Sequence, residues 1–138
     1  MAAVWTAEQL ELIASSRELE IASLGAGGQL RRFLPIWVVC VADQVYVRSW
    51  YRRTTGWFGL VVTAGTARIR VPGVERDVVV TDLGDDDAEL RAGVDQAYRD
   101  KYGTPGDEMV AGMLADAAAA TTLRLTPAGS PRSSWRRS

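Results

Sequence analysis

Short segments in which apolar and polar residues alternate dominate this chain, and they predict a mainly β protein. The clearest segment is residues 45–50, which read Val-Tyr-Val-Arg-Ser-Trp. Side chains along a strand point alternately to opposite faces. This strand should therefore carry two sets of side chains, with Val45, Val47 and Ser49 on one face and Tyr46, Arg48 and Trp50 on the other. We expect the second set to be exposed.

Two pairs of segments have the pattern of β-hairpins. Residues 19–24 and 30–33 flank a stretch of three glycines and an alanine, which is typical of a turn. Residues 67–71 and 74–81 flank a Pro-Gly turn and predict a second hairpin.

Two further strands are expected outside these hairpins. Residues 36–41 are β-branched and almost continuously apolar, which is typical of a strand buried on both faces. Residues 121–125 predict a last strand, which we expect to join the same sheet.

Helical segments should flank the strands. Thr6 and Gln9 have the spacing of a capping box and predict a helix over residues 6–15. Three aspartates at 85–87 favour the start of another helix, which Gly103 should end. Residues 108–120 have helical spacing, whereas residues 57–63 fit a strand or a helix equally well.

These elements predict a mainly β fold with peripheral helices (α+β), built as a small antiparallel barrel. About six or seven short strands joined mostly by hairpins are typical of that architecture. We expect residues 1–127 to form a single domain. Residues 128–138 are dominated by Gly, Ser, Pro and Arg, and they predict a disordered tail.

The composition excludes several kinds of chemistry. The 138 residues include no histidine and one cysteine, Cys40. Ser-His-Asp and Cys-His catalysis and histidine-ligated metal or heme sites are therefore excluded. One cysteine forms neither an internal disulfide nor a metal cluster. We predict no metal site, and we interpret Cys40 as an inert core residue.

The charge balance argues against nucleic acid and membrane partners. The net charge is -1, although arginines predominate between residues 31 and 77 and carboxylates between 82 and 124. A generic nucleic-acid binder would be basic overall. No apolar run reaches the length of a membrane-spanning helix, and no signal peptide is visible. We therefore expect a cytoplasmic protein.

The strongest candidate for a ligand site is the aromatic and basic stretch that ends the 45–50 strand. Aromatic rings can stack on a flat heterocycle, and arginines can hold a phosphate. The alternative is a half-solvated strand that leads into a surface loop. Arg68 and Arg70 alternate outward on another strand, and we interpret them as a solvated strand face. The set that defines the stretch is Tyr46, Arg48, Trp50, Tyr51, Arg52 and Arg53.

Several of these segments resemble the DUF2255 family of uncharacterised bacterial proteins. The most specific are Tyr-Val-Arg-Ser at 46–49 and Ala-Tyr-Arg-Asp-Lys-Tyr-Gly at 97–103. Residues 36–39, 73–78 and 121–127 extend the resemblance over nearly the whole chain. The strand order is similar to that of flavin-binding split barrels, including the deazaflavin-dependent nitroreductase-like proteins.

This resemblance implies a split-barrel homodimer that binds FMN or a deazaflavin, and it equally allows a protein with no cofactor. The implied cofactor-binding residues are Arg48, Ser49, Trp50, Arg52, Arg53 and Trp57. The arginines would take phosphate, and Trp50 and Trp57 would wall the ring.

Three functions follow as hypotheses for a small-molecule-binding protein. The first is a flavin- or deazaflavin-dependent oxidoreductase. The second is a cofactor-free enzyme of a biosynthetic pathway, such as a cyclase or isomerase, with its substrate inside a barrel lined by Trp and Tyr. The third is a non-catalytic binding module in which the arginines are merely solvated.

Overall fold

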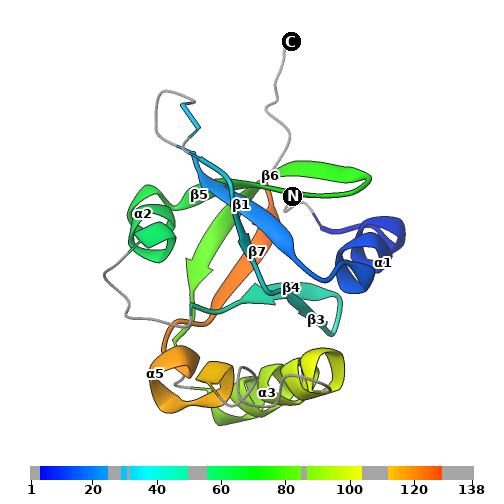
Figure 1. The fold of residues 1–138 in the computed structure, drawn as a ribbon, viewed down its shortest axis with the longest axis vertical. Coiled ribbons are helices and arrows are strands. Elements are labelled where there is room, and N and C mark those ends of the chain that lie inside the picture. Colours follow the sequence, from blue (N-terminus) through cyan, green and yellow to red (C-terminus); the bar gives the residue numbers. More distant parts are fainter. Residues whose placement is uncertain are drawn as a thin grey trace.

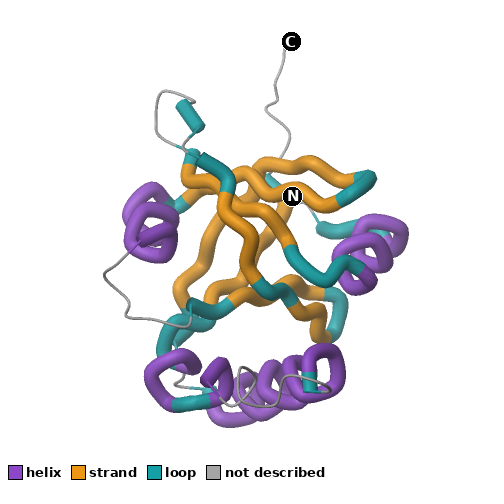
Figure 2. Tube along the Cα trace, viewed as in Figure 1, coloured by secondary structure: helices purple, strands orange, loops and turns teal. Residues whose placement is uncertain are grey.

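The computed structural model of the protein describes residues 4–24, 29–30, 32–49, 56–84, 87–103 and 112–128. Within them, seven strands build one curled sheet, and helices lie around it (Figures 1 and 2). The elements in chain order are α1 Ala7–Ser15, β1 Leu19–Ser23, β2 Leu34–Ile36, β3 Val39–Val41, β4 Gln44–Val47, α2 Gly56–Ala64, β5 Thr66–Val71, β6 Val74–Asp82, α3 Ala88–Tyr102, α5 Asp116–Ala119 and β7 Leu123–Pro127.

The order of the strands explains why the sheet curls. All neighbouring strands are antiparallel, in the order β2-β1-β5-β6-β7-β4-β3. The two edges, β2 and β3, follow one another in the chain with only Trp37 and Val38 between them. So short a connection requires the edges to lie close together, as in an open barrel. The predicted antiparallel split β-barrel with peripheral helices is confirmed.

Inward-facing side chains fill the barrel. Alternate residues of β5 and β7 are buried, as the two-residue period of a strand requires. They form one continuous core with residues of β1, β4 and the helices α1 and α2, including Ile21, Val45, Phe58, Ile69 and Leu125. Each such side chain contributes roughly 1.5–3 kcal/mol by leaving water. The hypothesis of a Trp- and Tyr-lined chamber for a substrate finds no support in this packing.

The first two helices form for local reasons. At α1, the Thr6 hydroxyl accepts the Gln9 N–H at 3.1 Å, and the Gln9 side chain accepts the Thr6 N–H at 3.0 Å, so the capping box is confirmed. The ambiguous residues 57–63 belong to helix α2. Its buried residues Phe58 and Val61 share one helical face, and Gly65 follows the helix at φ +74°, a backbone conformation that glycine adopts without strain.

The first hairpin differs from its prediction. Residues 30–33 form no strand in the described part of the chain, where Leu30 makes only an isolated bridge to Leu24. The partner of β1 is β2 at Leu34–Ile36, directly after the predicted segment, with Pro35 opposite Glu20. Proline lacks an N–H and is tolerated there because β2 is an edge strand. The predicted glycine turn at 25–28 lies outside the described residues.

The apolar segment 36–41 is not one strand buried on both faces, as the sequence predicts. It is divided between β2 and β3 at opposite edges of the sheet, and Pro35 is exposed while Ile36 and Cys40 are only partly buried. The hairpin of β5 and β6, in contrast, forms around Pro72 and Gly73 as predicted.

Helix α3 covers the second face of β4. Asp87 caps its first turn by accepting the Leu90 N–H at 3.0 Å, and Gly103 follows its last residue, as predicted. Its buried residues, Val94, Tyr98 and Tyr102, lie one helical turn apart and pack with Tyr46 of β4. The face that the sequence predicts to be exposed is therefore buried here.

Near the C-terminal end of the described chain, a helix and a strand have other boundaries than the sequence predicts. The helix predicted over 108–120 is interrupted, because the backbone of Ala115 is extended between the helical residues 112–114 and α5. Residues 104–111 lie outside the described residues. Pro127 belongs to β7 and pairs with Val78. Residues 129–138 also lie outside the described residues, so the disordered tail stays a prediction.

Candidate functional site

Arg48, directly after β4, is a buried cation with three internal hydrogen bonds. Only 1% of the surface of Arg48 is exposed. Its Nε donates to Thr122 Oγ1 at 2.9 Å, and its Nη1 donates to Asp95 Oδ1 at 2.6 Å and to the Met113 carbonyl at 2.9 Å. The prediction that Arg48 faces solvent is wrong, because α3 and the chain before β7 cover this face of β4. Arg48 instead ties the end of β4 to both.

Two polar atoms in this cluster have no hydrogen bond of good geometry with any described residue. They are Arg48 Nη2 and Tyr98 Oη, and both are buried. The Arg48 guanidinium carbon lies 5.6 Å from the centroid of the Tyr98 ring. Burial raises the pKa of the Tyr98 hydroxyl far above its ordinary value, although the Arg48 charge opposes this shift. Within the described residues, the Tyr98 O–H and the Arg48 Nη2 N–H groups therefore have no acceptor.

Ser49, the next residue, is also held by buried hydrogen bonds to the chain before β7. The Ser49 N–H donates to Thr121 Oγ1 at 2.8 Å, and the Thr121 hydroxyl donates to the Ala118 carbonyl at 2.6 Å. These bonds are buried, so they hold the chain firmly at the point where it leaves the sheet. The connection from β4 to α2 therefore starts from a fixed position.

Trp57 lies at the other end of this connection, in the first turn of α2. Its ring is partly buried and meets Phe58 edge to face, with centroids 5.8 Å apart. Of the predicted cofactor-binding residues, the structure describes Arg48, Ser49 and Trp57. Trp50, Arg52 and Arg53 lie outside the described residues.

The outer face of the sheet carries cross-strand ion pairs. Arg68 Nε lies 2.6 Å from Asp77 Oδ1, and Arg70 Nε lies 2.8 Å from Glu20 Oε1. All four side chains are partly exposed. The interpretation of Arg68 and Arg70 as a solvated strand face is confirmed, since both guanidinium groups already have carboxylate partners.

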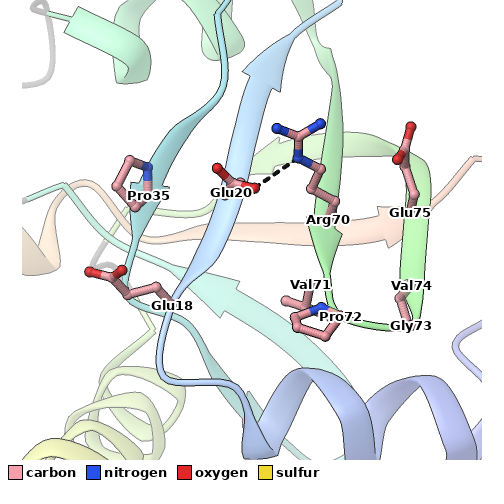
Figure 3. Close-up of a pocket in the computed structure, with 9 residues that line it drawn as sticks. All are labelled: Glu18, Glu20, Pro35, Arg70, Val71, Pro72, Gly73, Val74 and Glu75. Carbon is pink, nitrogen blue, oxygen red and sulfur yellow. Dashed lines mark hydrogen bonds and ion pairs between the residues drawn. The ribbon is translucent and has the colours of Figure 1, made fainter.

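A groove of about 860 Å³ runs over this face beside the Pro72-Gly73 turn (Figure 3). The ion pair of Arg70 with Glu20 crosses it, and Glu18 and Glu75 add two further carboxylates. Carboxylates therefore outnumber cations along the groove. Such a lining disfavours phosphate, and we do not place the phosphate of a cofactor here.

The C-terminal end of α3 holds the connection between the two sheet edges. Tyr102 Oη accepts the Val38 N–H at 3.1 Å and donates to the Arg17 carbonyl at 2.6 Å, while Lys101 Nζ donates to the Val38 carbonyl at 2.8 Å. Trp37 stacks on the Tyr102 ring at 4.0 Å. The sequence places these aromatic and basic residues on one helix, but it does not indicate which peptide they bind.

Neither a metal centre nor a membrane span is found in the described part of the chain. Its His, Cys, Asp and Glu residues form no group of three that could hold a metal ion. Its helices are too short or too polar to cross a bilayer.

The curled antiparallel sheet, closed by a two-residue connection between its edges, defines this protein as a split barrel of the kind found among flavin-binding proteins. The chain belongs to the DUF2255 family, described as an uncharacterized protein conserved in bacteria, whose model matches residues 9–125. A search of proteins with curated functions finds no match.

Several solved structures share this fold. The heme storage protein HutZ of Vibrio cholerae is 16% identical with a TM-score of 0.64, over 89% of each chain. An FAD-binding protein of Mesorhizobium loti is 15% identical with a TM-score of 0.55, over 91% of each chain. An F420 reductase is 12% identical with a TM-score of 0.53, over 86% of this chain and 92% of its own. At these identities the likeness shows the fold alone.

Proposed function

We propose that this protein binds a flavin or a deazaflavin at the connection between β4 and α2 and acts as an oxidoreductase on small molecules. The observation that carries the proposal is the buried anchor of Arg48 and Ser49, which fixes the start of a connection containing two arginines and a tryptophan. The similar folds of an FAD-binding protein and of an F420 reductase support the choice of cofactor.

Three of the described arginines are poor candidates for the phosphate ligand. A phosphate needs guanidinium groups that are not already paired. Arg68 and Arg70 are paired with carboxylates, and Arg48 is buried against Asp95. We assign the phosphate to Arg52 and Arg53 in the 50–55 segment, because the resemblance to flavin-binding split barrels points to them. Trp50 and Trp57 are the proposed walls of the ring site.

In this proposal Arg48 acts as a positioning residue, because its bonds orient the segment that follows it. A bound flavin or deazaflavin would supply the hydride-transfer chemistry, which the side chains of this histidine-free sequence do not provide.

The absorbance spectrum of the purified protein tests the proposal. The full chain is incubated separately with FMN, FAD and a deazaflavin, desalted, and scanned through the flavin bands. We expect one cofactor to remain in near-stoichiometric amount. A colourless protein after all three incubations would overturn the proposal and favour a non-catalytic binding module or a cofactor-free enzyme.

A pair of double variants locates the site. Replacing Arg52 and Arg53 by alanine should weaken retention at least about tenfold, since two charge-assisted hydrogen bonds are lost. Replacing Arg68 and Arg70 by alanine removes the same charge from the outer sheet face and should leave retention unchanged. The reverse pattern would move the phosphate to the groove of Figure 3.

We also propose that the protein is a cytoplasmic homodimer, as its resemblance to flavin-binding split barrels implies. Sedimentation equilibrium of the full chain, with and without the retained cofactor, measures the mass directly. A monomer under both conditions would contradict the dimer without affecting the cofactor assignment.

A further inference from the structure

The one lysine and the one cysteine of this sequence share a pocket. Lys101 and Cys40 both line a surface pocket of about 270 Å³ between α1, β3 and α3. The remaining lining residues are Ala14, Val39, Ala97 and Asp100. None of these lining residues is among those proposed to hold the flavin, so the pocket is a separate site.

Lys101 is held by carbonyl groups and not by a carboxylate. Its Nζ donates to the Val38 carbonyl at 2.8 Å and lies 3.5 Å from the Ile13 carbonyl. No ion pair joins it to a carboxylate among the described residues. The ammonium group is therefore oriented by neutral acceptors and keeps little compensation for its lost hydration.

The surroundings of Lys101 favour the neutral amine. Burial lowers the pKa of Lys101 from 10.5 to about 8, and the nearby charge of Arg17 adds to this effect, while Cys40 opposes it. About a tenth of the amine is then unprotonated at pH 7, against well under a thousandth for an ordinary lysine. The other titratable groups beside it are Asp100 in the pocket and Tyr102, whose ring lies 5.3 Å from Nζ.

Cys40 adds a neutral thiol to the same pocket. Burial raises the pKa of this thiol above 9.0, although the positive charge of Lys101 opposes the shift. Its sulfur lies 4.0 Å from the Leu10 carbonyl, which is within reach of a weak S–H hydrogen bond. The pocket therefore offers a thiol beside the lysine amine.

We propose that this pocket is a covalent binding site for small, uncharged aldehydes or ketones, with Lys101 Nζ as the nucleophile. Ala14, Val39 and Ala97 provide apolar walls for a short alkyl chain. These walls disfavour a charged group, so anionic carbonyl compounds such as keto acids should bind less well.

The reaction is an imine formation that requires no oxidant or reductant. The lone pair of the neutral amine forms the N–C bond while the carbonyl π electrons move to oxygen, which takes up a proton. The two protons that nitrogen loses are balanced by the two that the carbonyl oxygen gains, and this oxygen leaves as one water molecule when the C–O bond breaks. No atom changes its oxidation state.

Reductive alkylation with acetaldehyde and cyanoborohydride tests the nucleophile. The matched control is Arg99→Lys, which adds an ordinary lysine at an exposed position of α3. Both lysines then meet the same reagents in one chain, and peptide mass mapping measures each rate. At pH 7 we expect Lys101 to react at least about tenfold faster than the added lysine. An equal or slower rate would overturn the proposal.

The pH dependence sharpens this test. The rate at Lys101 should reach half its maximum near pH 8, whereas the lysine introduced at position 99 should still gain rate above pH 10. Glyoxylate in place of acetaldehyde should lower the preference for Lys101, because the apolar walls of the pocket disfavour its carboxylate. An undiminished preference for glyoxylate would contradict the assignment of uncharged ligands.

A second reagent tests the shared pocket itself. o-Phthalaldehyde joins one amine and one thiol into a fluorescent isoindole with loss of two water molecules, and it does so within one chain only when the two groups are close. We expect fluorescence from the folded protein and its loss in Lys101→Arg and in Cys40→Ser. No fluorescence from the folded, unmodified chain would overturn the shared site.

Folding and cofactor binding are checked in the same variants. Circular dichroism of Lys101→Arg and Cys40→Ser should match that of the unmodified chain, and flavin retention should be unchanged. If the carbonyl chemistry fails while flavin retention persists, only the second site is wrong.

Discussion

Two cations lie against helix α3, and their surroundings differ in one decisive way. Arg48 is buried at the middle of the helix and bonds to the Asp95 carboxylate, which also lies 3.6 Å from Arg91. Lys101 is only partly buried near the end of the helix and bonds to main-chain carbonyls. The first cation has a charged partner and the second has only dipoles.

This difference separates a structural charge from a reactive one. A guanidinium keeps its proton under all physiological conditions, and a carboxylate partner compensates its burial. A lysine amine gives up its proton readily when it is desolvated without a carboxylate. We therefore interpret Arg48 as a fixed anchor and Lys101 as the group poised for chemistry.

The largest effect should come from breaking the Arg48 anchor. Arg48→Met leaves Asp95 partly buried beside a weaker partner and removes three hydrogen bonds, so the free energy of unfolding should fall by about 3–5 kcal/mol. Urea denaturation measures it. The control Arg68→Met breaks a partly exposed pair and should cost about 1 kcal/mol or less. Equal losses in both variants would refute the distinction.

A smaller effect should follow from removing the Tyr102 hydroxyl, which holds the connection between β2 and β3. Tyr102→Phe leaves the buried Val38 N–H without its acceptor, which should cost about 1–3 kcal/mol in urea denaturation. Tyr98→Phe is the matched control on the same helix. Its hydroxyl has no well-formed bond to a described residue, so its loss should be close to neutral. A larger loss for Tyr98→Phe would contradict this assignment.

The smallest effect is the pH dependence that Lys101 contributes. Its pKa is about 8 when folded and 10.5 in the unfolded reference, so the unfolded chain holds more protons between these values. The free energy of unfolding should therefore rise with pH in that window. The destabilisation caused by burying the charged Lys101 amine is fully present below pH 8. Cys40, whose pKa is raised above 9.0, acts in the opposite direction.

Two chains isolate that contribution. Unfolding of Cys40→Ala is measured from pH 7 to 9, where tyrosine with its ordinary pKa near 10 is still mostly protonated, and is compared with Cys40→Ala carrying Lys101→Met. The rise in stability should appear in the first chain and be absent from the second. Parallel profiles would show that Lys101 keeps an ordinary pKa.

Local patterns predicted those parts of the fold that local physics determines. The alternation of 67–71 and 74–81 around a Pro-Gly turn is sufficient for the β5–β6 hairpin, and a side-chain cap explains the start of α1 and of α3. The barrel is consistent with many short antiparallel strands that each have one apolar face, because curling the sheet is one way to bury that face.

Contacts between distant parts of the chain decided the rest. The break at Val38 depends on Tyr102, 64 residues later, which bonds a peptide group that would otherwise extend a strand. The burial of Arg48 depends on Asp95 and Thr122. Alternation shows that two faces of a strand differ, but it does not show that a helix covers the polar one. For the same reason the sequence indicated an aromatic and basic site without its buried anchor.

The position of the last strand has a consequence for synthesis on the ribosome. β7 lies between β6 and β4, so residues 123–127 join two sets of strands that are otherwise not paired with each other. Until this strand emerges, the nascent chain holds a four-stranded piece and a two-stranded piece with unsatisfied inner edges. The barrel therefore closes only after translation has passed residue 127. Until then, the edges of β6 and β4 have unpaired backbone N–H and C=O groups, and such edges are prone to aggregation unless chaperones cover them.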